Sequence, residues 1–207
     1  MPTIAQHIDE IRNLDVGNHT IRDIKKKNWG WLNFPEKDAL YGAIFVNDVI
    51  NLSRAEVKAE TDIKTKIMKV LMWGYKKTNG SLRPQYFDSI VNHLNVLEPI
   101  FADIQNRNLN AEERKNFFTR LRTVNGLGQS TYSKLLYFFN VSFEDKKCLI
   151  LDTFVIANLK VFDEFSGINW VQSQNCYLTY LNKIDELAGL HNVSPEQLER
   201  FLFGYRA

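Results

Sequence analysis

The chain has 207 residues, of which 44% are hydrophobic and 24% charged, as expected for a globular protein long enough to bury a sizeable core. Its formal net charge of +2 is too balanced to indicate a nucleic-acid partner by itself. No apolar run approaches the roughly 18 residues of a membrane span, and the first residues do not resemble a signal peptide, so no membrane partner is expected. The two cysteines, Cys148 and Cys176, provide neither a disulfide framework nor a four-cysteine cluster site, which favours a reducing, cytoplasmic location.

Helical periodicity dominates the sequence, and strand-like alternation is rare. In chain order, helices are expected over residues 4–14, 36–50, 62–75, 84–105, 111–124, 129–139, 152–162 and 171–190, with a last helix within 194–207. Pro99 can break the fourth of these, because proline removes an intrahelical donor. The longest segment without helical periodicity is 19–35. The predicted fold class is therefore all-α, with about nine or ten helices joined by short connections.

Two of these helices begin with a capping signal. Asn110 precedes one of them with Glu113 three residues later, and Ser194 precedes another with Gln197 three residues later. Asn79-Gly80 lies between two helical segments, where glycine supplies a positive φ after a helix end. Three basic groups can form a nucleic-acid-binding face or can simply be solvated surface. They are Lys25-Lys26-Lys27, Lys76-Lys77, and the pair Arg120 and Arg122.

A turn with two glycines, Asn125-Gly126-Leu127-Gly128, separates the helix over 111–124 from the helix that starts at Gln129. The glycines allow backbone N–H groups to point outward at the start of the second helix. Unsatisfied donors and the helix dipole converge there, so this end can bind a phosphate. A tight helical corner without a ligand is the alternative interpretation.

Asp152 follows an apolar segment and stands where the next helix begins, which is an N-cap position. Backbone N–H groups at that position stabilise a carboxylate. A carboxylate that faces a pocket can also stabilise the positive charge that develops on a sugar when its base departs. For this residue taken by itself, capping alone is the favoured interpretation.

Together, the segments Val124-Asn-Gly-Leu-Gly-Gln-Ser-Thr131 and Ile150-Leu-Asp-Thr-Phe-Val155 resemble the helix-hairpin-helix DNA glycosylase superfamily. With Met72-Trp-Gly-Tyr75 and Thr131-Tyr-Ser-Lys-Leu-Leu-Tyr-Phe138, the chain looks closest to small bacterial proteins of the 8-oxoguanine glycosylase fold, some of which occur in antiphage (type IV CBASS) operons. The resemblance implies one helical domain over 1–207, with two lobes around a cleft. Its hairpin and catalytic-type segment would span 110–162.

In that superfamily the hairpin binds the DNA backbone, which implies this role for Asn125, Gly126, Gly128 and Gln129. The aspartate near the next helix start is catalytic, which implies this role for Asp152. No metal and no cofactor are implied, because the four histidines show no metal-ligand spacing and the iron–sulfur cysteines of the adenine-specific branch are absent.

The chain departs from the superfamily at its nucleophile. Bifunctional 8-oxoguanine glycosylases carry a lysine two residues after the second glycine, whereas this chain has Ser130, which excludes a Schiff base from that position. Asn125 also replaces the usual proline. Lys134 lies one helical turn after Ser130. Three pocket roles are open to it: a displaced nucleophile, a contact to a purine acceptor, or a buried partner of Asp152. The alternative is that its ammonium extends to solvent from an otherwise aromatic helix.

The last helix offers a second pocket wall. In 8-oxoguanine glycosylases a C-terminal helix presents a glutamine and, four residues later, a phenylalanine to the flipped base. Two registers fit that spacing here, Gln197 with Phe201 and Glu199 with Phe203, and the second matches better. A glutamate can accept from both N1–H and the 2-amino group of a guanine-like edge.

These patterns predict an N-glycosylase that acts on a modified, 8-oxoguanine-like purine, with DNA as its partner, in repair or antiphage defence. The alternative is a binding module that holds a guanine or deazaguanine group without cleavage. That group would be free or attached to a partner protein encoded in a defence operon. The balanced charge and Ser130 favour the binding module, whereas Asp152 and the glycine hairpin favour the enzyme.

Overall fold

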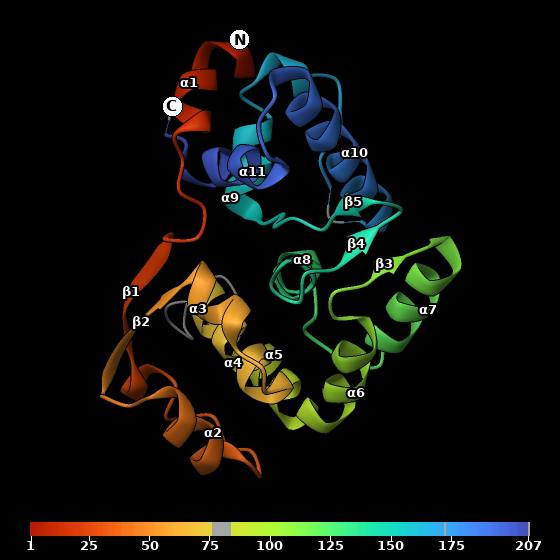
Figure 1. Ribbon diagram of the computed structural model, residues 1–207. Coiled ribbons are helices and arrows are strands. Elements are labelled where there is room, and N and C mark those ends of the chain that lie inside the picture. The colour runs from red at the N-terminus through yellow and green to blue at the C-terminus, as the bar shows by residue number, and fades with distance from the viewer. Residues whose placement is uncertain (76–83, 172, 207) are drawn as a thin grey trace.

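The computed structural model describes residues 1–75, 84–171 and 173–206 (Figure 1). Helices make up 59% of the described residues, which confirms the all-α prediction. The α-helices are α1 (Ile8–Arg12), α2 (Lys37–Ile44), α3 (Arg54–Ala59), α4 (Ile63–Gly74), α5 (Pro84–Asn92), α6 (Leu94–Ile104), α7 (Ala111–Leu121), α8 (Gln129–Phe138), α9 (Thr153–Leu159), α10 (Gln174–His191) and α11 (Pro195–Gly204). Three short 3-10 helices, η1 (Ile4–His7), η2 (Lys26–Asn28) and η3 (Asp163–Phe165), complete the helical elements of these ranges.

The helices group into two lobes with α8 between them (Figure 1). The terminal lobe contains α1, α9, α10 and α11, so both ends of the chain lie in it. The central lobe contains α2 to α7 together with the strands β1 (Thr20–Lys25) and β2 (Val49–Ser53). Every residue of α8 except Ser130 is buried, and one cluster of buried hydrophobic side chains extends through both lobes. The helix that follows the glycine turn is therefore the central core helix.

Strands occupy two places that the sequence analysis left helical or irregular. β1 and β2 pair antiparallel, and a second small sheet joins β3 (Asn108–Leu109), β4 (Ser142–Phe143) and β5 (Lys146–Lys147). The prediction that this helix continues to residue 50 is wrong, because α2 ends at Ile44 and β2 follows. Ile50 and Leu52 of β2 are buried while Val49 and Asn51 are exposed, which is the alternation of a half-buried strand, rich in β-branched residues.

The prediction of a helix break at Pro99 is also wrong. The helix over 84–105 does divide, but it does so at His93, between α5 and α6, and Pro99 lies inside α6. A proline at this position removes only the hydrogen bond to the backbone carbonyl of Asn95. Asn95 is exposed, so water can satisfy that carbonyl.

The capping signals were reliable guides to helix starts. Asn110 and Ser194 both form the expected capping boxes, at α7 and α11. A third capping box, of Ser53 with Glu56, starts α3, a helix that the sequence analysis missed. Asn79-Gly80 and Lys76-Lys77 lie outside the described residues. Within the described ranges, no helix has both the length and the apolar character needed to cross a membrane.

Candidate active site

The turn between α7 and α8 is built around Gly126. Its φ of 91° lies in the left-handed region, and a Cβ there would stand 2.7 Å from the Cβ of Tyr86 in α5, so the fold requires glycine. Gly128, the N-cap of α8, has an ordinary φ of −67°, and a Cβ there would meet no atom within 4 Å. The fold does not require glycine at this second position. Its missing side chain instead leaves the N-terminus of α8 open to a ligand.

Gln129, the first residue of α8, is buried, yet neither its amide nitrogen nor its amide oxygen has a hydrogen-bond partner among the described residues. Leaving a buried polar group unpaired costs about 1–3 kcal/mol. Asn125 is exposed at the start of the same turn. The hairpin therefore brings together an open helix end, an exposed amide and a buried, unpaired amide.

Lys134 and Asp152 form a buried ion pair. The Nζ of Lys134 lies 3.1 Å from Oδ2 of Asp152, and the two side chains are 2% and 7% exposed. The same Nζ donates to the backbone oxygen of Ser130 at 3.1 Å and to its Oγ at 3.0 Å. All three N–H groups of the ammonium are thus used within the chain. Of the three roles considered for Lys134, contact with Asp152 is the one seen in this structure.

Asp152 also caps α9, as its position in the sequence indicates. Its Oδ1 accepts from the backbone N–H groups of Phe154 at 3.0 Å and Val155 at 3.1 Å, while Oδ2 accepts from Lys134. Both oxygens are therefore held, and the orientation of the carboxylate is fixed by two helices at once. The cap joins α9 of the terminal lobe to the central helix α8.

The segment that leads to Asp152 is extended and buried, and side chains satisfy its backbone groups. The bonds run from Tyr177 Oη to Leu149 O (2.9 Å), from Tyr180 Oη to Ile150 O (3.1 Å) and from Leu151 N to Ser133 Oγ (3.1 Å). Burial raises the pKa of both tyrosines well above its usual value, so they remain hydrogen-bond donors. The sequence analysis missed these positioning residues; the only signal was two tyrosines three residues apart on a helix.

The end of α4 forms the other side of the site. Tyr75 Oη lies 3.4 Å from Ser130 Oγ and 2.9 Å from Thr131 Oγ1, and its ring lies 5.4 Å from Lys134 Nζ. Gly74 leaves room for the stem of Lys134, because a Cβ there would stand 2.6 Å from the lysine Cδ. Gly74 and Tyr75 carried no assigned role in the sequence analysis, although they belong to one of the segments that supported the resemblance.

Glu199 lies in this region, but Arg54 occupies both of its oxygens. Nη1 of Arg54 is 2.5 Å from Oε2 and Nη2 is 3.0 Å from Oε1. Burial raises the pKa of Glu199, and the charge and hydrogen bonds of Arg54 oppose that rise. Arg54 also donates to Tyr137 Oη at 3.2 Å and to Nδ1 of His19 at 3.2 Å. The two oxygens of Glu199, which would accept hydrogen bonds from a guanine-like edge, thus already accept from Arg54 in this structure.

His19 is the neutral member of this cluster. Burial, followed by the charges of Arg54 and Arg200, lowers the pKa of His19 to about 3. A neutral imidazole can accept the hydrogen bond that Arg54 donates. The sequence analysis singled out neither Arg54 nor His19, and the capping box that starts α3 was the only local signal near Arg54.

The two proposed registers of the last helix point to different neighbours. The ring of Phe203 packs against Phe154, two residues after the cap of α9, with centroids 6.1 Å apart. Gln197 instead donates to a backbone carbonyl at the end of α1 at 2.9 Å, and Phe201 packs against Phe162 at 5.7 Å. Phe203 therefore packs against the start of α9, the helix that Asp152 caps, whereas Gln197 and Phe201 contact α1 and Phe162.

The comparisons with known proteins agree with this geometry. Residues 14–203 match the model of a protein family described as "Putative 8-oxoguanine DNA glycosylase OGG-like protein". Neither the curated proteins nor the solved structures yield a match. The matched range contains the glycine turn, α8 and Asp152, and it supports a glycosylase-like function with DNA as a partner. The chain therefore belongs to the 8-oxoguanine DNA glycosylase OGG-like family.

Proposed function

We propose that this protein is an N-glycosylase that hydrolyses the bond between a modified purine base and its deoxyribose in DNA, with Asp152 as the catalytic carboxylate. The buried pair of Lys134 and Asp152, directly behind the open N-terminus of α8, carries this proposal. Family membership supports it independently.

In this reaction the C1′–N9 bond breaks, the base leaves with the bonding electrons, and positive charge develops on the sugar. Water then bonds to C1′, and its proton is passed on so that the departing nitrogen is protonated. A carboxylate near C1′ opposes the positive charge and can accept the proton of the water. Asp152 suits this task because two backbone N–H groups and Lys134 hold it in one orientation.

Lys134 acts as a positioning residue in this proposal. A nucleophilic amine must present a free lone pair, whereas the three N–H groups of Lys134 all donate to Ser130 and Asp152. Ser130 occupies the place of the usual nucleophile and cannot form a Schiff base. We therefore expect the base to be removed without cleavage of the DNA strand.

The hairpin would hold the DNA backbone next to the reacting nucleotide. Gly128 has no side chain that could cover the first N–H groups of α8. An uncovered helix N-terminus suits a phosphate oxygen, which accepts hydrogen bonds and carries negative charge. The family description supports an 8-oxoguanine-like base. The biological role, repair or antiphage defence, then depends on whether cellular or phage DNA carries the base.

The test is incubation of the protein with single-stranded and duplex oligonucleotides that contain 8-oxoguanine or other modified purines. Mass spectrometry would detect the released base, and alkali would reveal abasic sites. We expect release by the wild type and by the control variant Asp185→Asn, whose aspartate is exposed on α10, and none by Asp152→Asn. The absence of release from every substrate, combined with binding of free 7-deazaguanine, would favour a binding module instead.

A further inference from the structure

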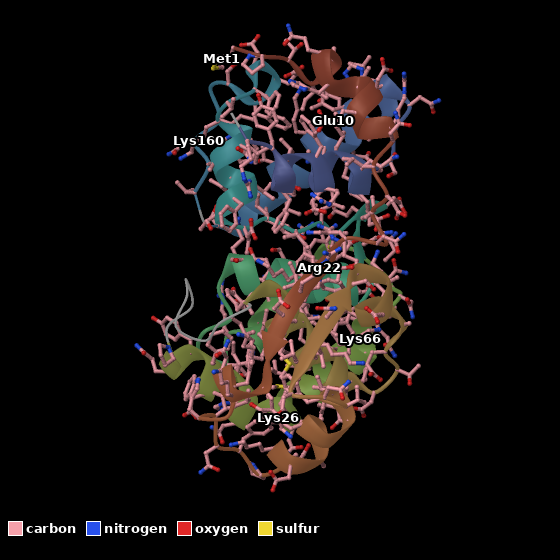
Figure 2. The ribbon with its side chains drawn as sticks, turned by 90° about the vertical axis from the view of Figure 1, so that its left-hand side faces the viewer. Met1, Glu10, Arg22, Lys26, Lys66 and Lys160 are labelled. Carbon is pink, nitrogen blue, oxygen red and sulfur yellow. The ribbon has the colours of Figure 1, made fainter. Side chains whose placement is uncertain are left out.

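A basic cavity lies in the central lobe, at the end of β1. Its volume is about 810 Å³, and the side chains that matter for its chemistry are Lys25, Lys26, Lys27, Lys37, Tyr41 and Val49. We call it the lysine cavity. Figure 2 shows Lys26 near the bottom of the molecule, far from Met1, Glu10 and Lys160 of the terminal lobe. Neither Lys134 nor Asp152, nor any described residue that is hydrogen-bonded to them, lines this cavity.

The charge of the lysine cavity is strongly unbalanced. Lys25, Lys26 and Lys27 are exposed, and none forms an ion pair with another described residue. Two aspartates, Asp38 and Asp48, also line the cavity, so its four lysines leave a net charge of +2. The whole chain has the same formal net charge. This one cavity therefore holds as much net positive charge as the entire protein, which favours an anionic ligand.

Hydrogen bonds hold two of the residues that line the lysine cavity in place. Lys37 donates through Nζ to the backbone oxygen of Gly30 at 2.5 Å, and its Nζ lies 5.7 Å from the centre of the Tyr41 ring. Tyr41 Oη in turn donates to the backbone oxygen of Trp29 at 2.6 Å. Tyr41 is only 4% exposed and the Lys37 ammonium lies over its ring, so the charged side chains, and not the ring, provide the contact surface. A cavity lined mainly by cations matches the phosphate group of a nucleotide, which carries negative charge and accepts hydrogen bonds.

We propose that the lysine cavity binds a nucleotide unit of the same nucleic-acid strand that the hairpin holds. The identity of that strand rests on the proposed function. β1 leads from His19, which contacts Phe203, to the cavity. At about 3.3 Å per residue a strand of this length spans roughly 20 Å, or about six nucleotides at 3.4 Å each. The cavity would therefore contact DNA several nucleotides from the reacting base.

The test measures the affinity of an unmodified single-stranded oligonucleotide by fluorescence anisotropy over a series of salt concentrations. Lys25→Ala/Lys27→Ala is compared with Lys146→Ala/Lys183→Ala, which removes the same charge from β5 and α10. We expect the first variant to bind more weakly and to lower the salt slope by about 1.4, because each phosphate contact contributes roughly 0.7 for single strands. The control variant should keep the wild-type slope.

Equal affinities and slopes in the two double variants would overturn the proposal. So would binding of a deoxynucleoside monophosphate that only Lys25→Ala/Lys27→Ala weakens, with oligonucleotide affinity unchanged, because the cavity would then be a free-nucleotide site. The oligonucleotide carries no modified base, so the result does not depend on base excision. Failure of this binding test would therefore leave the proposed glycosylase activity untouched. Failure to excise a base would, in turn, leave the result of this binding test untouched.

Discussion

The side chain of Lys134 lies directly against Gly74, the last residue of α4. A Cβ on Gly74 would stand 3.0 Å from Cε and 2.6 Å from Cδ of the lysine, and the second distance is shorter than real Cβ atoms show. Any side chain at position 74 must therefore push the lysine stem aside. The pair of Lys134 with Asp152 depends on a glycine from a different helix and lobe.

We expect Gly74→Ala to abolish or strongly reduce base excision while the protein still folds. The lysine is flexible and can move, but its Nζ then leaves Asp152. The gain in helix propensity, about 1 kcal/mol, should offset part of an overpacking cost of about 1–3 kcal/mol. Chemical denaturation and an excision assay would measure the two effects separately.

The matched control is Gly189→Ala in α10, where a new Cβ meets no atom within 4 Å. It should stabilise the protein by about 0.5–1 kcal/mol and leave excision unchanged. Wild-type excision in both glycine variants would contradict the role given to Gly74.

Much of the site could be predicted from the sequence because its signals are local. The two glycines mark the turn, and Asp152 stands at a helix start that it caps. The position of Lys134 follows from Ser130 by one helical turn. Each of these inferences needs only residues that are a few positions apart.

The partner of Glu199 could not be predicted in the same way. Arg54 is 145 positions away in the sequence, and no periodicity or cap connects the two residues. The same limit applies to Tyr177 and Tyr180, which donate to backbone carbonyls about 30 positions earlier. A spacing pattern can place a carboxylate on a helix, but it does not tell which cation the folded chain brings to it.

Ser130 should form no covalent intermediate. Treatment of the protein with abasic DNA and borohydride should trap no complex through this position, because a serine cannot form a Schiff base. Its Oγ accepts a hydrogen bond from the ammonium group of Lys134 at 3.0 Å and so helps to hold that group in place. Electrophoresis of the trapped mixture would measure the outcome. Trapping that survives Lys134→Ala but disappears in Ser130→Ala would refute this prediction.

The lobes are also linked by an ion-pair cluster at Glu196, on α11. It accepts from Lys58 of α3 at 2.6 Å and from Lys147 of β5 at 2.9 Å. Burial would raise the pKa of Glu196, but the two lysines outweigh it and lower this pKa to about 2. The ionised form is therefore favoured in the folded protein, and its stabilisation is present above pH 4.5 and lost as the pH falls toward 2.

We expect Glu196→Gln to reduce the free energy of unfolding at pH 7 by about 2–3 kcal/mol, because one pKa unit corresponds to about 1.4 kcal/mol and solvent screening of this partly exposed cluster reduces the total. The difference from the wild type should shrink below pH 4.5 and vanish near pH 2. Urea denaturation at several pH values would show this. Glu186→Gln, which removes an exposed partner of Lys183, is the control and should cost less than about 1 kcal/mol at every pH. A pH-independent effect of Glu196→Gln would contradict the assignment.

The last prediction concerns the energy that couples Lys134 to Asp152. Asparagine keeps an acceptor for the cap of α9, so Asp152→Asn removes mainly the charge opposite the buried ammonium. An unpaired buried charge costs about 3–5 kcal/mol, whereas Lys134→Met/Asp152→Asn leaves no charge unpaired. The double variant should therefore be more stable than the sum of the two single losses predicts, by about 1–3 kcal/mol.

Chemical denaturation of the four proteins would measure this coupling, with the exposed pair of Lys183 and Glu186 as the control cycle. Additive losses, within about 0.5 kcal/mol, would mean that the pair contributes no coupling energy. Excision should remain absent in the double variant even where stability returns, because the carboxylate that opposes the charge on the sugar is still missing. Recovery of excision together with stability would instead make Asp152 a structural cap and remove it from the chemistry.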